Sequence, residues 1–242
     1  MSEELKLTID GKNIQMPKGS LILDAAEEAG IHIPTLCYSR HTKAMGLCRV
    51  CVVEVEDRRG LQPACVTPVR AGMVVHTRTP RIERVRRTIL EMLASSVDLS
   101  DAPEIESLLE EYGARPTRFQ YAQARTRAII EDNPVFIRDY SKCILCWRCV
   151  QVCAEDAQFS YAISRSGRGF RSGIATFLEK PLTETTCVFC GQCVGTCPTG
   201  ALKSKREMLL EEGVPLADLM ETTRARGLGR ASRKGPRLDT GG

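Results

Sequence analysis

Cysteine is the residue that constrains this chain most, because it occurs twelve times among 242 residues. The cysteines form an N-terminal and a C-terminal group, and residues 66–142 between them contain none. A secreted disulfide scaffold would be shorter and would carry an export signal, whereas residues 1–10 include Glu3 and Glu4 and have no long apolar run. We therefore expect a cytoplasmic protein whose cysteines bind metal or carry out redox chemistry.

The C-terminal group repeats the spacing Cys-x2-Cys-x2-Cys-x3-Cys, and Pro198 follows the second run. This is the spacing of bacterial ferredoxins, in which the fourth cysteine of each run binds the cluster held by the other run. Zinc usually takes two separated Cys-x2-Cys pairs and fits such a duplicated run poorly. The spacing predicts one [4Fe–4S] cluster bound by Cys143, Cys146, Cys149 and Cys197. It predicts a second [4Fe–4S] cluster bound by Cys187, Cys190, Cys193 and Cys153.

The first 80 residues have the pattern of a small α+β domain. Alternating apolar residues predict strands over 5–9, 12–16, 50–56 and 73–77. Asp10-Gly11 is a turn signal between the first two strands, and a helix is expected over 21–29, with Ser20 as its N-cap. Two hairpin strands, a crossing helix and further strands make a β-grasp pattern. The N-terminal cysteines of this segment are Cys37, Cys48, Cys51 and Cys65.

Three short segments around these cysteines carry a family resemblance. They are Ile-Pro-Thr-Leu-Cys-Tyr at 33–38, Gly-Leu-Cys-Arg-Val-Cys at 46–51 and Pro-Ala-Cys at 63–65. They resemble the [2Fe–2S] domain of the large iron–sulfur subunit of respiratory complex I and of the corresponding subunits of NAD-linked hydrogenases and formate dehydrogenases. With the two ferredoxin runs, the resemblance extends over residues 3–205, and the chain looks most like a small diaphorase-type iron–sulfur subunit. It implies a [2Fe–2S] cluster on Cys37, Cys48, Cys51 and Cys65.

The chain departs from this family at one point. The family usually binds a third [4Fe–4S] cluster through a His-x3-Cys-x2-Cys-x5-Cys segment between the two cysteine groups. Here residues 86–91 resemble the lead-in and residues 106–113 the exit of that segment, but residues 94–104 contain neither cysteine nor histidine. We therefore expect three clusters and no third [4Fe–4S] site.

These observations divide the chain into four parts. We expect a [2Fe–2S] β-grasp domain over 1–80 and a helical spacer over 81–130, where apolar residues recur at helical spacing. A ferredoxin-like domain with two [4Fe–4S] clusters is expected over 131–210. Residues 211–242 are expected to form a short helix and a flexible basic tail, because Arg and Gly are frequent there and apolar residues are few.

Composition excludes several other functions. The net charge is +4 and aromatic residues make up 5%, so a nucleic-acid partner is not expected, and no apolar stretch is long enough to span a membrane. No spacing suggests a nucleophile with its base or a nucleotide-binding loop, so no catalytic residues are expected in this chain.

The resemblance implies a subunit that passes electrons between a flavin/NAD(H) subunit and a catalytic subunit, a [NiFe] hydrogenase or a formate dehydrogenase. A ferredoxin is a further candidate partner, and electron bifurcation a further candidate activity. The alternative is a free-standing ferredoxin-like carrier or a redox sensor. Free carriers are usually smaller and strongly acidic, so the size and basic charge of this chain favour the subunit.

Overall fold

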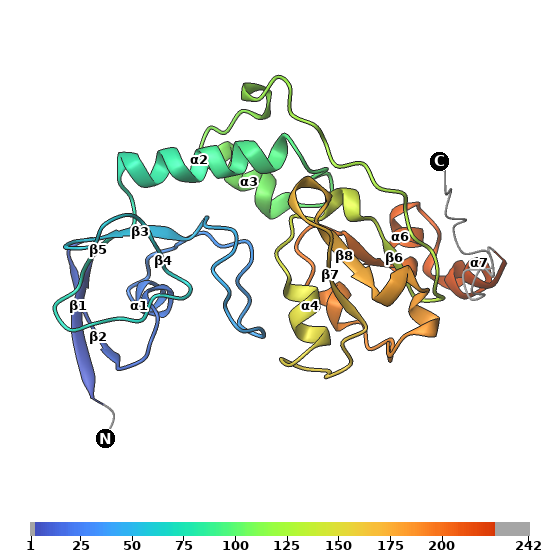
Figure 1. The fold of residues 1–242 in the computed structure, drawn as a ribbon, viewed down its shortest axis with the longest axis horizontal. Helices are drawn as coiled ribbons and strands as arrows, with labels where there is room; N and C mark the ends of the chain where they lie inside the picture. Colours follow the sequence, from blue (N-terminus) through green and yellow to red (C-terminus); the bar gives the residue numbers. More distant parts are fainter. Residues whose placement is uncertain (1–2, 226–242) are drawn as a thin grey trace. The chain divides into compact units, whose positions relative to one another are not determined.

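A computed structural model describes residues 3–225 of the chain. The contacts divide the chain into two compact units, 1–123 and 124–242 (Figure 1). The basic tail that the sequence suggests lies almost entirely in residues 226–242, outside the described residues. Within the described part, no helix is long and apolar enough to cross a membrane.

The first unit is built on a five-stranded sheet with the strand order β2-β1-β5-β3-β4. β1 pairs with β2 in an antiparallel hairpin and with β5 in parallel, and β3 pairs antiparallel with β4 and β5. The parallel pair at the centre is what a β-grasp pattern requires, and the expected α+β class is confirmed. The strands are β1 (Glu4–Ile9), β2 (Lys12–Pro17), β3 (Val52–Val55), β4 (Gln62–Pro63) and β5 (Val74–His76).

Helix α1 (Ile22–Glu28) packs its apolar face into the core of this unit. Ile22, Ala25 and Ala26 are fully buried, together with strand residues such as Ile9. The expected N-cap is wrong: the N-cap is Leu21, whose backbone N–H donates to Asp24 Oδ2 at 3.0 Å, so a carboxylate inside the first turn performs the capping instead of Ser20.

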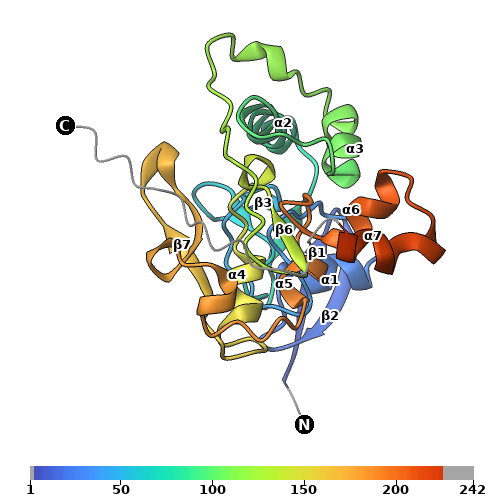
Figure 2. The same cartoon turned by 90° about the vertical axis from the view of Figure 1, so that its right-hand side faces the viewer.

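Two further helices, α2 (Pro80–Ala94) and α3 (Pro103–Glu111), complete the first unit and lie side by side in Figures 1 and 2. Thr79 caps α2 by accepting a hydrogen bond from the Ile82 N–H, and Pro80 occupies the first turn, where no N–H is needed. Leu90 is fully buried. These helices are therefore packed parts of the first unit.

Beyond α3 the helical expectation fails. Only one short turn, η1 (Pro116–Arg118), follows, and residues 119–129 contain no helix. A physical reason is that the apolar residues of 121–129 are mostly alanine and lie exposed, so a helix there would bury little apolar surface.

The second unit contains two small antiparallel sheets and several short helices, with one core around the cysteine runs and a smaller apolar cluster between α6 and α7. The sheets pair β6 (Phe136–Arg138) with β9 (Leu202–Ser204) and β7 (Ile163–Ser166) with β8 (Gly173–Thr176). The α-helices are α4 (Arg148–Cys153), α5 (Gln192–Gly195), α6 (Lys205–Glu211) and α7 (Leu219–Ala225). The 3-10 turns are η2 (Tyr140–Lys142), η3 (Gly169–Arg171), η4 (Phe177–Glu179), η5 (Leu182–Glu184) and η6 (Leu216–Asp218).

Pairing of β6 with β9 joins the two ends of the cysteine-rich region. Ile137 of β6 lies opposite Lys203 of β9, so the chain just before the first cysteine run meets the chain just after the second. Asn133 strengthens this closure, because its buried amide accepts the Phe136 N–H at 2.7 Å and donates to the Phe136 carbonyl. The closure places the two runs around a common core.

Candidate iron–sulfur cluster sites

The first unit brings its four cysteines together in one loop region. The Sγ atoms of Cys51 and Cys65 are 3.4 Å apart, and the Cys48 N–H points at Cys37 Sγ at 3.4 Å. Cys37, Cys51 and Cys65 are buried, and Cys48 is half-buried. The structure thus assembles the predicted N-terminal set as two adjacent thiol pairs.

Hydrogen bonding inside each pair separates the acidities of its thiols. The bond between Cys37 and Cys48 raises the pKa of Cys37 and lowers that of Cys48 to about 5. The bond between Cys51 and Cys65 likewise raises the pKa of Cys65 and lowers that of Cys51. Binding of iron by all four thiolates therefore requires the release of protons from these thiols.

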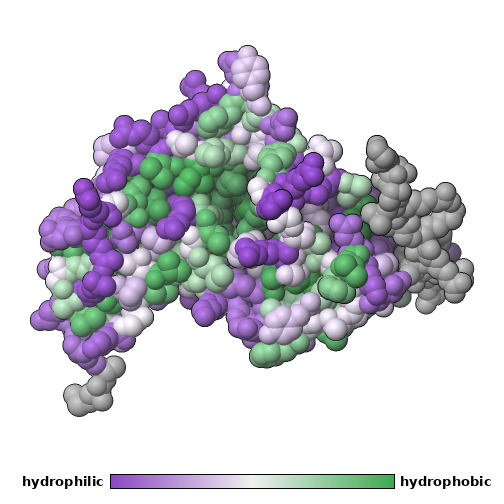
Figure 3. All heavy atoms as spheres, in the orientation of Figure 1, coloured by the Kyte–Doolittle hydropathy of each residue, from purple (hydrophilic) through white to green (hydrophobic). Residues whose placement is uncertain are grey.

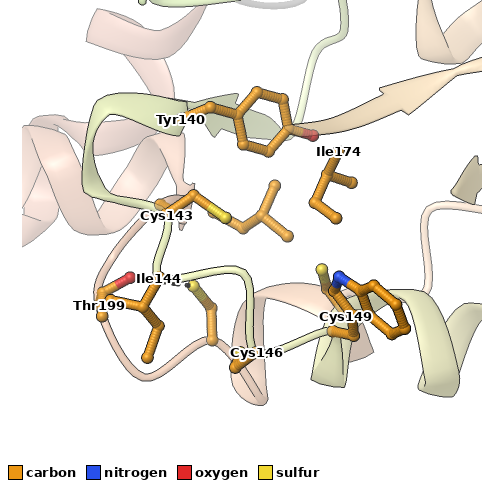
Figure 4. A pocket seen from close by; sticks show the side chains of 11 residues that line it. Tyr140, Cys143, Ile144, Cys146, Cys149, Ile174 and Thr199 are labelled. Atoms are coloured by element: carbon orange, nitrogen blue, oxygen red, sulfur yellow. Dashed lines mark hydrogen bonds between the residues drawn. The ribbon is translucent and has the colours of Figure 1, made fainter. Parts of the chain in front are cut away.

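In the second unit, a pocket collects the first predicted [4Fe–4S] ligand set (Figure 4). Three of its cysteines come from the run that leads into α4, and Cys197 reaches the same pocket from the second run, beyond α5. The remaining lining is almost wholly apolar, as Ile174 and Trp147 illustrate. The cysteines of this pocket are Cys143, Cys146, Cys149 and Cys197.

Burial dominates the electrostatics of this pocket. It raises the pKa of Cys146 to about 11, and the neighbouring thiol of Cys197 contributes to the same shift. Burial likewise raises the pKa of Cys149 well above its usual value. Without metal these thiols keep their protons at neutral pH, so cluster binding releases protons.

The second predicted [4Fe–4S] set also converges. Burial raises the pKa of Cys193 to about 12, and the next contributions come from Cys153, Cys187 and Cys190, the other three members of the set. Burial raises the pKa of Cys187 too, and Cys153 again contributes. Cys190 is exposed, in contrast to its counterpart Cys146. This second site therefore lies nearer the surface of its unit than the first.

In both cysteine runs a backbone N–H group donates to the first thiol of the run. The Leu145 N–H donates to Cys143 Sγ and the Phe189 N–H to Cys187 Sγ, each at 3.4 Å. Leu145 and Phe189, which stand at equivalent places in the two runs, both have positive φ, of 56° and 53°. Such φ values are costly for bulky side chains, and they occur here at the residue whose own N–H donates to the thiol of its run. The sequence repeat is thus repeated in the geometry.

The donor chemistry of all three sites fits iron–sulfur clusters. Each site offers four thiols, and the surroundings of the pocket in Figure 4 are apolar. Among the described residues, no three His, Cys, Asp or Glu side chains are close enough to hold a single metal ion. In a [4Fe–4S] cluster each thiolate binds a different iron atom, and in a [2Fe–2S] cluster each iron takes two of the four, so neither cluster needs three protein ligands around one ion. Ligation by each named cysteine stays a prediction.

Two family models match the chain. A "2Fe-2S iron-sulfur cluster binding domain" matches residues 2–80, and a "4Fe-4S dicluster domain" matches residues 142–201. These matches confirm the expected order of domains and the expected cofactors, one [2Fe–2S] cluster and two [4Fe–4S] clusters.

Curated relatives share most of this chain but are much longer. The NADP-reducing hydrogenase subunit HndD of Solidesulfovibrio fructosivorans is 43% identical over 217 residues, which cover 82% of this chain and 36% of HndD. The mitochondrial NADH-ubiquinone oxidoreductase 78 kDa subunit of Neurospora crassa is 34% identical over 212 residues, which cover 84% of this chain and 28% of that protein. The chain thus spans roughly a third of the length of these curated relatives.

The structure of a solved protein matches this chain over most of the length of both. It is a chain of an NAD+-reducing [NiFe]-hydrogenase in the H2-reduced state, with a TM-score of 0.73 and 30% identity, covering 83% of this chain and 87% of that chain. The chain belongs to the family of iron–sulfur subunits of NAD(P)-linked hydrogenases and complex I. The resemblance and the general function expected from the sequence, electron transfer through iron–sulfur clusters, are confirmed at this level.

The first prediction for this iron–sulfur subunit is its metal content. Four cysteines at each of three sites should hold one [2Fe–2S] and two [4Fe–4S] clusters, or about ten irons and ten acid-labile sulfides per chain. Anaerobic purification followed by iron and sulfide analysis measures both. About fourteen irons would reveal an overlooked [4Fe–4S] cluster, and stoichiometric zinc would contradict the assignment.

Sequence reasoning missed one residue near the sites. Arg86 of α2 is 2% exposed and contacts the backbone on both sides of Cys51. A signal was present, because Arg86 falls midway between Ile82 and Leu90, where the helical spacing calls for an apolar residue.

Proposed function

We propose that this chain relays electrons between a flavin/NAD(H) subunit and a catalytic subunit, a [NiFe] hydrogenase or a formate dehydrogenase. The observation that carries the proposal is the match to the NAD+-reducing [NiFe]-hydrogenase chain over 87% of that chain. The proposal includes a cytoplasmic location, supported by cysteines spaced as metal ligands. Bound clusters supply one-electron chemistry, so the protein contributes position, exclusion of water and electrostatic tuning.

The residues of the second unit perform these tasks as follows. The thiols of Cys143, Cys146 and Cys149 would hold one [4Fe–4S] cluster with Cys197 from the other run. Because the fourth ligand of each site comes from the neighbouring run, and because α4 contacts α5, the two sites are tied to the same rigid core. Apolar walls exclude water from the first site, and backbone N–H groups donate to its sulfur ligands. Two sites held in fixed positions on one core suit rapid electron transfer between them.

An exposed apolar surface lies beside the segment that leads into the second [4Fe–4S] site. The N–H groups of Ser160 and Tyr161 bond the Cys153 carbonyl, and the Ser160 and Thr186 hydroxyls bond each other's backbone carbonyls. This places the aromatic loop near Cys153 beside the segment that leads into Cys187. The large exposed side chains of this surface are Phe159, Tyr161, Phe177, Leu178 and Val188.

We assign this surface to the partner subunit that exchanges electrons with the second site. Apolar side chains reach the face of the second unit in Figure 3 among charged ones, and Phe177 and Leu178 are 76% and 75% exposed. Docking there would bury these side chains and bring a redox centre of the partner close to the exposed Cys190. A permanently docked subunit explains the exposed apolar side chains better than a free carrier does.

The segment in which the family usually binds a third [4Fe–4S] cluster is filled with buried apolar side chains here. Val97, Leu99 and Ala102 are buried in the stretch where the family usually has its ligands. The proposed electron path therefore runs through the three remaining sites only.

A second prediction tests the relay. The isolated chain with intact clusters should oxidise neither NADH nor hydrogen nor formate, because the proposed relay leaves substrate chemistry to its partner subunits. Tagged and purified anaerobically from its host, the chain should bring with it a flavoprotein that oxidises NADH, identified by mass spectrometry and assayed directly.

The exposed surface supplies a matched comparison for that experiment. A Phe177→Ser/Leu178→Ser variant should weaken partner binding by about tenfold or more, equivalent to about 1.4 kcal/mol, while keeping all its iron. Phe170→Ser, at an aromatic residue that is 53% exposed on a different turn, should bind normally. A monomeric chain that shuttles electrons freely between purified oxidoreductases would support the free carrier instead.

A further inference from the structure

Helix α2 carries a buried positive charge that forms no ion pair with any of the described residues. The Arg86 side chain is fully buried, and all its bonds go to neutral acceptors: Nε to the Val50 carbonyl, Nη2 to the Val52 carbonyl and Nη1 to the Tyr112 hydroxyl, each at 2.9 Å. Arginine stays protonated even when buried. Among residues 3–225, no carboxylate lies within 4.0 Å of its nitrogens.

A carboxylate is available on the same helix but is used elsewhere. Glu91 is 3% exposed, and it pairs with Arg118 at 2.7 Å and accepts the Arg115 N–H at 3.2 Å. Burying a charge without an opposite charge is costly, and three neutral acceptors compensate only in part. The position of Arg86 therefore calls for a negative charge nearby that the side chains alone do not supply.

The predicted [2Fe–2S] site supplies that charge. Val50 and Val52, whose carbonyls Arg86 binds, are the two neighbours of Cys51, which is 1% exposed. Four thiolates give a [2Fe–2S] cluster a net negative charge that grows by one when the cluster accepts an electron. In a buried, low-dielectric environment, a fixed cation close to the ligand loop favours the more negative, reduced form.

We propose that Arg86 is a positioning residue for the [2Fe–2S] cluster, which holds the Cys51 segment in place and raises the reduction potential of the cluster through its buried charge. The inference rests on the ligand assignment made above, and it concerns how easily that cluster accepts an electron. The Tyr112 hydroxyl, 2.9 Å from Nη1, orients the guanidinium but adds no charge.

The test compares three variants of the full chain, loaded with clusters, in potentiometric titrations followed by electron paramagnetic resonance. Arg86→Gln should lower the equilibrium constant for one-electron reduction of the [2Fe–2S] cluster about tenfold, a shift of about 59 mV to lower potential. Arg86→Lys keeps the charge and should stay within about twofold of the wild type. Tyr112→Phe removes the hydrogen bond to Nη1 but leaves the charge, so its reduction constant should also stay within about twofold of the wild type. The [4Fe–4S] clusters serve as internal references and should not shift.

Each outcome decides the matter. A loaded Arg86→Gln variant with an unchanged [2Fe–2S] potential would overturn the inference and leave Arg86 a purely structural residue. Should Arg86→Gln fail to load, loading of Arg86→Lys with a near-normal potential supports the role of the charge, and failure of both variants overturns it. A wild-type chain with no [2Fe–2S] signal would overturn the ligand assignment together with the inference, whereas a failure confined to Arg86 would leave the relay function untouched.

Discussion

Replacing Cys197 with alanine should remove the [4Fe–4S] cluster that is wrapped by the first cysteine run, although Cys197 belongs to the second run. The reason is the pocket in which Cys197 lies beside Cys143, Cys146 and Cys149. With three thiols left, that cluster should be lost or reduced to a three-iron form. The iron content should fall by about one to four atoms per chain, which metal analysis and electron paramagnetic resonance will measure.

Cys153 provides the mirror-image variant. It belongs to the first run, but it contributes to the raised pKa values of Cys187 and Cys193, so Cys153→Ala should damage the cluster of the second run. The two variants should therefore lose different [4Fe–4S] signals, each the opposite of what position along the chain suggests. A Cys197→Ala protein that keeps the first-run cluster and loses the second would refute the crossing of ligands.

Replacing Leu90 with alanine should destabilise the first unit by about 2–5 kcal/mol, because a fully buried leucine leaves a cavity when it is truncated. Leu90 lies on α2, in the segment that the sequence marks as a spacer. Thermal unfolding followed through the visible absorption of the [2Fe–2S] cluster reports on this unit.

Met92 is the matched control for Leu90. It lies on the same helix but is 56% exposed, so Met92→Ala should change stability by less than about 0.5 kcal/mol. Equal and small effects of the two substitutions would show that α2 is a peripheral spacer after all. A large effect of Leu90→Ala alone would establish that the helix is a packed part of the unit.

The two [4Fe–4S] clusters were readable from the spacing of the cysteines, because ligation of such a cluster depends on local spacing, whereas the [2Fe–2S] cluster was implied by the family resemblance. Two short intervals between cysteines wrap three thiols around one cluster, and a third interval carries the fourth thiol away. The same spacing predicted that Cys197 would join the first run, and the structure places it there. Strands β1 and β2 were also readable, since alternation along 5–9 and a turn at Asp10-Gly11 are local signals.

The N-cap of α1 and the end of the helical region were predicted incorrectly from the sequence. Ser20 is a good capping residue by type, but the backbone places Leu21 at the N-cap and lets Asp24 satisfy its N–H. Residues 119–129 have helix-compatible composition in part, but the apolar residues of 121–129 are mostly alanine and lie exposed, so they contribute little to a core. Propensity is a weak prior, and packing overrides it.

Only the tertiary structure decided how the helices of the first unit are used and what surrounds its cluster site. The spacing of Ile82 and Leu90 shows an apolar face, but not that this face packs in the first unit, nor that Arg86 within it reaches the carbonyls beside Cys51. Arg86 and Val50 are 36 positions apart, and their contact depends on how a helix crosses a sheet rather than on any local pattern. Sequence periodicity identifies which residues need partners, whereas the partners themselves are chosen by three-dimensional packing.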